Sequence, residues 1–222
     1  MENNSFSRYF NLIIPLLDDG EYGIDSGAAE RLRAMSDTAV YTTRGLPDTI
    51  TLTDTEGRER ALYDVVTRRP QVIDPRPLVL GGKFTPFRPV IVIPEEDEKC
   101  SAWKTIHEIC HLLSVGGYRE SGNGVFFHCF GLNQYSYRRV SWEGKPRMVG
   151  RREFPIKNEI FNDAVTWHFM ERLAGECVLP PDEFTSANCR GLKESEGFKK
   201  LIGMYFSGDP ESAGRLAEYV IK

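Results

Sequence analysis

Two histidines four residues apart constrain the fold of this 222-residue chain more than any other feature. They belong to the motif His107-Glu108-Ile109-Cys110-His111. Residues four apart in an α-helix differ by only about 40° around its axis, so both imidazoles project from one face, about one turn apart. The apolar run at residues 90–93 predicts a buried strand before this helix. We expect the helix to run from Ser101, as N-cap, to about Val115 and to stop at a left-handed Gly116-Gly117.

This spacing of imidazoles is typical of a zinc site. A catalytic zinc takes three protein ligands and leaves the fourth position for water. Glu108 lies on the flank of the histidine face, where a carboxylate can reach that water without binding the metal, which suits a general base. The extended motif HExxHxxGxxH would supply the third ligand, but it needs glycine and histidine where this chain has Ser114 and Gly117. The third ligand must therefore come from elsewhere.

A second helix, predicted over residues 158–173, carries two suitably spaced acids. Glu159 and Asp163 are four apart and share one face. His168 lies nine residues from Glu159, about 180° away on an unbroken helix, so we do not expect it to bind the same metal. Acids at this spacing are common on solvated helix faces, and they indicate a site only together with the histidine motif.

The two motifs, with the aromatic segment between them, resemble the gluzincin group of zinc metallopeptidases, which are thermolysin-like in the broad sense. The resemblance implies Zn²⁺ bound by His107, His111 and Glu159. It implies Glu108 as the general base and Asp163 as the carboxylate that holds a ligand imidazole. Zinc-bound imidazoles usually donate their second N–H to such a carboxylate, which agrees with this assignment.

The resemblance covers roughly residues 88–175, under half of the chain. Enzymes of this group also have histidine and tyrosine residues that stabilise the oxyanion, and no motif here identifies them. The candidates by chemistry are Tyr135, Tyr137, His128 and His168. A packing role in a strand or helix is the favoured interpretation for each of them.

The pattern along the chain predicts an α+β fold, and the resemblance implies a zincin-like one. In it, a mixed sheet packs on the histidine helix and on the second, glutamate-bearing helix. We expect residues 1–87 to form an N-terminal arm, a helix from Asp25 or Ser26 to Met35 and a hairpin that turns at Gly57, all of unknown role. Six prolines between Pro70 and Pro94 favour a boundary there. Residues 88–222 would then form the metallopeptidase domain, although one continuous domain stays open.

Three further segments complete the prediction. Residues 124–140 are rich in aromatic residues around Gly131, which predicts strands or a second hairpin. Residues 192–206 predict a helix closed by Gly208. Asp209-Pro210-Glu211 predicts the start of a last helix, with an N-cap acid and proline in the first turn.

Charge and cysteine usage limit the partners and the compartment. Lys plus Arg number 28 against 32 Asp plus Glu, a net charge of −4, which argues against nucleic acid and acidic membrane surfaces. The apolar run at residues 12–17 is short and contains Pro15, unlike a signal peptide or a membrane span. The 5 cysteines include no CxxC pair. Reduced thiols in the cytoplasm are the simplest account.

The predicted function is hydrolysis of a peptide or protein substrate, with an edge strand of the sheet holding the peptide by backbone hydrogen bonds. A second hypothesis is a regulatory or interaction module that keeps the zinc but does not cleave; Glu108 argues against it, because a structural site has no need for that acid. A third is another HExxH zinc hydrolase or deacylase. The deformylase type would need a ligand cysteine in an upstream Glu-Gly-Cys motif, and Glu98-Lys99-Cys100 lacks that context. The oligomeric state is left open.

Overall fold

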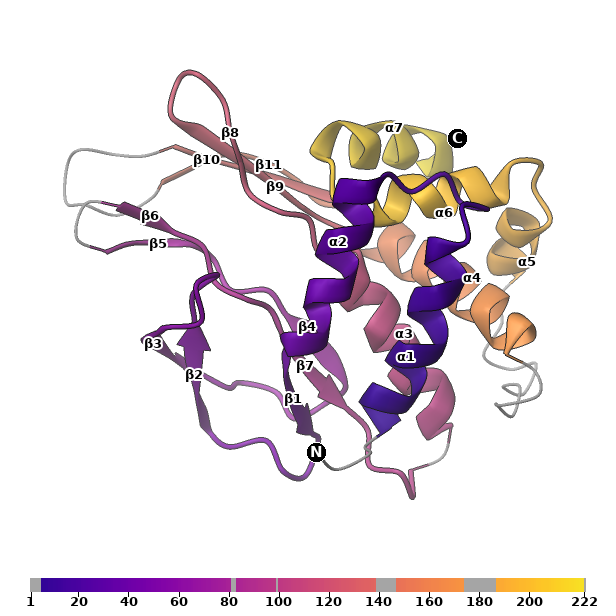
Figure 1. The fold of residues 1–222 in the computed structure, drawn as a ribbon, viewed down its shortest axis with the longest axis horizontal. Helices are drawn as coiled ribbons and strands as arrows, with labels where there is room; N and C mark the ends of the chain where they lie inside the picture. The colour runs from indigo at the N-terminus through magenta and orange to yellow at the C-terminus, as the bar shows by residue number, and fades with distance from the viewer. Residues whose placement is uncertain (1–4, 81–82, 99, 139–146, 174–186, 222) are drawn as a thin grey trace.

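The computed structural model describes residues 5–80, 83–98, 100–138, 147–173 and 187–221, and it shows an α+β protein (Figure 1). The helices are α1 (Ser5–Asp18), α2 (Ser26–Ala34), the 3-10 turn η1 (Met35–Asp37), α3 (Ser101–Leu113), α4 (Pro155–Arg172), α5 (Ala187–Lys193), α6 (Phe198–Phe206) and α7 (Pro210–Ile221). The strands are β1 (Ala39–Thr42), β2 (Thr49–Thr53), β3 (Glu59–Asp64), β4 (Gln71–Ile73), β5 (Leu78–Leu80), β6 (Lys83–Thr85), β7 (Val90–Ile93), β8 (Arg119–Glu120), β9 (Val125–Phe130), β10 (Asn133–Arg138) and β11 (Arg147–Arg152). Among the described helices, none has the length and apolar character that crossing a membrane requires.

A small mixed sheet lies directly before the histidine helix. Its order is β1-β7-β4, with β1 parallel and β4 antiparallel to β7. All residues of β7 are buried, which confirms the strand predicted at residues 90–93. The predicted boundary after residue 87 runs through this sheet, because β1 and β4 precede it and β7 follows it.

The other strands form antiparallel units. The hairpins predicted around Gly57 and Gly131 are confirmed as β2-β3 and β9-β10, and both glycines have a positive φ. The second hairpin belongs to a four-stranded sheet in the order β11-β10-β9-β8. We call this sheet the β8–β11 arm, since it projects to one side of the helical body in Figure 1.

The segment predicted as an N-terminal arm is a helix, α1, which packs against α3. Its buried side chains follow a helical period: Phe6, Tyr9, Phe10, Ile13 and Leu17. Pro15 lies inside the helix, where it removes a backbone hydrogen bond at a cost of about 3 kcal/mol. Burying each large apolar side chain contributes about 1.5–3 kcal/mol, so together they outweigh the proline.

The ends of two predicted helices differ from expectation. Helix α3 starts at Ser101 as predicted, but Cys100 is the capping residue, and the helix ends at Leu113 without a left-handed glycine. Gly116 is required for space instead, because a β-carbon there would lie 2.6 Å from the Gly208 carbonyl oxygen. The helix predicted over 192–206 starts later, as α6 at Phe198, because α5 ends at Lys193 and the chain turns at Gly197 with φ of 82°; Gly208 follows α6 with a positive φ, as predicted.

The remaining helix predictions are confirmed. Asp25 caps α2 by accepting a hydrogen bond from the Ala28 backbone N–H at 2.8 Å. Helix α4 covers the predicted segment and starts slightly earlier, at Pro155. Asp209 accepts a hydrogen bond from the Ser212 backbone N–H at 3.0 Å and so caps α7. The described cysteines Cys100, Cys110, Cys129 and Cys189 are free thiols, while Cys177 lies outside the described residues.

Arg31 on α2 joins the C-terminal ends of two other helices. Its guanidinium donates to the carbonyl oxygens of Leu113 at 3.3 Å and of Val115, just after α3. It also donates to the Phe206 carbonyl oxygen at the end of α6, at 2.6 Å. A cation is favourable there, because the free carbonyl groups give a helix C-terminus a partial negative charge.

Replacing Arg31 by Met should therefore lower the free energy of unfolding by about 3 kcal/mol, because buried carbonyl oxygens lose their charged donor. The control is Arg33→Met on the same helix, since exposed Arg33 makes only a surface ion pair with Asp18, worth about 0–1 kcal/mol. Urea unfolding measures both. Equal losses for the two variants would contradict the role of Arg31.

Candidate metal centre

The two motif helices pack side by side and bring their polar faces together. Helix α3 buries Ile106, Ile109 and Leu113 in the hydrophobic core, and its period directs His107 and His111 toward α4. Helix α4 has the same design: its apolar side chains enter the core, while Glu159 and Asp163 face α3. The site is thus built by helix packing on a rigid core rather than by loops.

His107, His111 and Glu159 form a group that could hold a metal ion. The Nε2 atom of His107 lies 3.3 Å from Glu159 Oε2, and the Nε2 atom of His111 lies 3.2 Å from Glu159 Oε1. Ligands at about 2.0–2.1 Å from a tetrahedral metal are about 3.3 Å from one another, so these separations fit one ion. One ligand atom from each residue lies within 4.8 Å of the others.

The site is open on the side of the glutamate. The side chain of His111 is 6% exposed and that of His107 is 15% exposed, whereas the Glu159 side chain is 56% exposed. Burial tends to raise the pKa of Glu159, but the two imidazoles outweigh it and hold the pKa well below its usual range. The carboxylate is therefore ionised at neutral pH and can bind a cation.

Asp163 lies behind His107, on the side away from Glu159. Its Oδ1 is 2.9 Å from His107 Nδ1. Burial lowers the pKa of His107, but Asp163 and Glu159 together outweigh it and raise the pKa to about 10. Asp163 favours a proton on Nδ1, and Nε2, which faces Glu159, would lose its own proton on binding a metal.

Glu108 is buried next to the two histidines. Burial raises the pKa of its carboxyl group, and the charges of His111 and His107 act in the opposite direction. Arg69, two residues before β4, acts in the same direction as the histidines, and together they offset part of the effect of burial on the pKa. A carboxylate with a raised pKa beside an open metal site is a better proton acceptor than a free one.

Comparisons with family models, with curated proteins and with solved structures found no match to this chain. The geometry of the site is therefore the basis for any assignment.

Asn162 is a residue of the site that the sequence did not indicate. It is fully buried on α4, and its Nδ2 donates to the His107 carbonyl oxygen at 2.9 Å. Its Oδ1 accepts a hydrogen bond from the Tyr205 hydroxyl on α6 at 3.1 Å. Asn162 thus joins the backbone of α3 at His107 to α4 and α6. The sequence offered one signal: Asn162 directly precedes Asp163 and falls among the apolar residues of the predicted helix.

The four oxyanion candidates make other contacts. The Tyr135 hydroxyl donates to Glu153 Oε1 at 3.3 Å, and buried Tyr137 packs among the aromatic rings of the arm. His128 Nε2 lies 2.6 Å from Asp74 Oδ2, and His168 Nε2 lies 2.9 Å from the Tyr22 hydroxyl. None of these contacts joins the four candidates to His107, His111 or Glu159.

Proposed function

We propose that this chain is a zinc-dependent peptidase with a zincin-like arrangement of helices and sheet. One observation carries the proposal: a buried carboxyl group, Glu108, adjoins a group of two histidines and one glutamate that is open to solvent. Two imidazoles and a carboxylate suit zinc, and three protein ligands leave a position for water or substrate. A structural zinc site usually closes that position with a fourth protein ligand.

In the proposed reaction, the metal and the side chains of the site have separate roles. Bound zinc would polarise the scissile carbonyl group and lower the pKa of water toward neutrality. Glu108 would accept a proton from the attacking water and pass it to the leaving amine. Asp163 would keep His107 oriented through Nδ1, and Asn162 would hold the backbone at His107 in place.

The mixed sheet offers a place for an extended substrate. Strand β4 is an edge strand, antiparallel to β7, and α3 packs against it. Helix α3, which carries Glu108, packs directly against this strand. Backbone groups on an open edge can pair with a peptide, and the scissile bond would then lie beside Glu108.

Metal removal tests the proposal. Purified protein should contain about one zinc per chain and hydrolyse members of a broad peptide library at neutral pH. Dialysis against a chelator should remove both the zinc and the hydrolysis, and added Zn²⁺ should restore them. His107→Ala and His111→Ala should prevent reconstitution while the arm and the sheets stay folded. Zinc binding without hydrolysis of any peptide would favour a regulatory or interaction module, and protein that takes up no zinc would exclude the site.

A further inference from the structure

The two faces of the β8–β11 arm have opposite character. On one face, rings from β9 and β10 form an aromatic cluster, in which Phe126 stacks on Phe84 of β6 at 3.8 Å. The other residues of this cluster include Tyr118, His128, Tyr135 and Tyr137. The opposite face points away from this cluster, and the strand register shows which side chains lie on it.

The opposite face is basic. Residues paired across an antiparallel ladder share a face, and faces alternate along each strand. Gln134 pairs with Arg152, and Arg138 pairs with Arg147, so both pairs lie on the face opposite to Tyr135 and Tyr137.

A β-bulge gathers these arginines on one face. Ser136 pairs with Gly150 and Tyr137 with Met148, which leaves Val149 as the extra residue of β11. Without the bulge, strict alternation would place Arg147 and Arg152 on opposite faces, since they are five residues apart. Bulges commonly redirect side chains in this way near functional surfaces.

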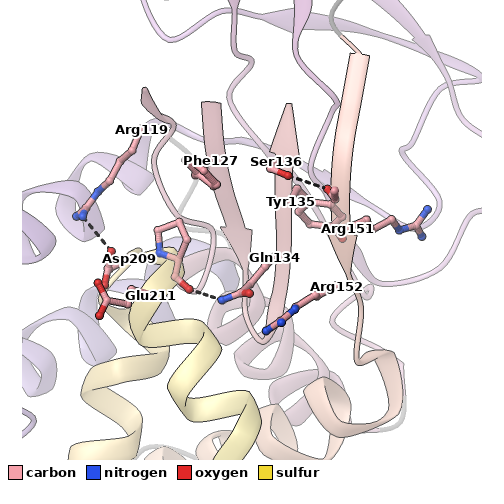
Figure 2. Close-up of a pocket in the computed structure, with 11 residues that line it drawn as sticks. Arg119, Phe127, Gln134, Tyr135, Ser136, Arg151, Arg152, Asp209 and Glu211 are labelled. Atoms are coloured by element: carbon pink, nitrogen blue, oxygen red, sulfur yellow. Dashed lines mark hydrogen bonds and ion pairs between the residues drawn. The ribbon is translucent and has the colours of Figure 1, made fainter. Parts of the chain in front are cut away.

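A groove of about 710 Å³ runs between this face and the start of α7 (Figure 2). Figure 2 shows Arg152 pointing from β11 toward α7, and Arg151 pointing away. Arg119 reaches the groove from β8 and forms an ion pair with Asp209 at 2.9 Å. Phe127, which is 39% exposed, contributes an apolar surface to the groove. The start of α7 adds the carboxylate of Glu211 to the rim.

The pairing of Arg138 with Arg147 is unfavourable for the isolated protein. Like charges directly opposite each other in a sheet destabilise it, and the described residues give neither arginine an ion pair. Charges on an edge strand can prevent aggregation, but that purpose does not require the same sign on both members of a pair. A ligand that supplies negative charge would remove the repulsion.

We propose that the basic face of the β8–β11 arm binds an extended, acidic segment of polypeptide, which adds as a strand to the outer edge of β11. One feature favours a polypeptide over a nucleic acid. Among the described residues, β11 is the last strand of its sheet, so the backbone N–H and C=O groups of its outer edge have the spacing that an added peptide strand matches. Arg147 and Arg152 of β11 would then lie beside the acidic side chains of the added strand.

The test measures binding by fluorescence anisotropy with the full chain at low salt. The probes are a short labelled peptide in which Glu alternates with Val, the same peptide with Lys in place of Glu, a version with prolines that cannot pair as a strand, and single-stranded and double-stranded DNA. We expect binding of the acidic peptide alone among these probes. Arg138→Glu combined with Arg147→Glu should weaken it at least about tenfold, because four units of charge change at the contact. The control is the charge reversal Lys200→Glu on α6, an exposed residue outside the arm.

A single variant separates binding from folding. Arg147→Glu turns the like-charge pair into an opposite-charge pair. It should therefore raise the melting temperature of the protein while it weakens binding of the acidic peptide. Mass spectrometry confirms that the probe stays intact, which keeps this test independent of peptidase activity. Unchanged affinity in the double variant, equal binding of the proline peptide, or tighter binding of DNA would each overturn the proposal.

Discussion

Glu108→Gln should retain zinc and stability and lose peptide hydrolysis by about 10²–10⁴-fold, the range expected when a general base is removed. The amide keeps the shape and volume of the acid but accepts no proton from water. Burial already raises the pKa of Glu108, so a neutral side chain is tolerated at this position. Glu108 also lies outside the group of three residues that could hold the ion, so the metal content should not change.

The measurement pairs zinc content with turnover of the peptide library for wild type and variant. Glu218→Gln on α7 is the matched control, because it makes the same chemical change at an exposed position outside the site. Equal turnover by Glu108→Gln and wild type would refute the proposed base. Loss of zinc together with turnover would assign Glu108 to metal binding instead.

Glu159→Ala should reduce zinc content to a small fraction of one per chain, because the carboxylate that faces both Nε2 atoms is removed. Asp163→Ala should have a smaller effect, about 10–100-fold in zinc affinity or in activity, through loss of the group that orients His107. Competition with a chelating dye measures both affinities. Release of zinc by Asp163→Ala but not by Glu159→Ala would require the two assignments to be exchanged.

The sequence predicts the members of the candidate metal-binding group where local helix geometry determines their positions. The spacing of His107 and His111 places them on one face of a helix whatever the rest of the fold is. The same holds for Glu159 and Asp163, and the structure brings both faces together. That these helices pack against each other was inferred only from the resemblance, because helical spacing says nothing about which helix lies opposite.

Features that depend on distant partners were missed. Asn162 acts through carbonyl and hydroxyl groups on α3 and α6, and no local pattern reveals them. Arg31 looks like an ordinary surface residue of a helix until the ends of α3 and α6 are placed beside it. The N-terminal segment is a helix because its buried apolar residues recur at helical spacing, and they gain this burial by packing against α3, a distant part of the chain.

The central position of β7 in its sheet has a consequence for the order in which the chain folds during synthesis. The outer strands of its sheet, β1 and β4, leave the ribosome first and have no partner until the central strand follows. Helix α3 is synthesised directly after β7. The pairing of β1 and β4 with β7 and the synthesis of the two histidines therefore follow each other closely. Glu159 emerges about fifty residues later, and until then a nascent chain has only two of the three candidate ligands. If this group binds a metal as proposed, uptake would belong to a late stage of folding, after the strands and helices from the first part of the chain have formed.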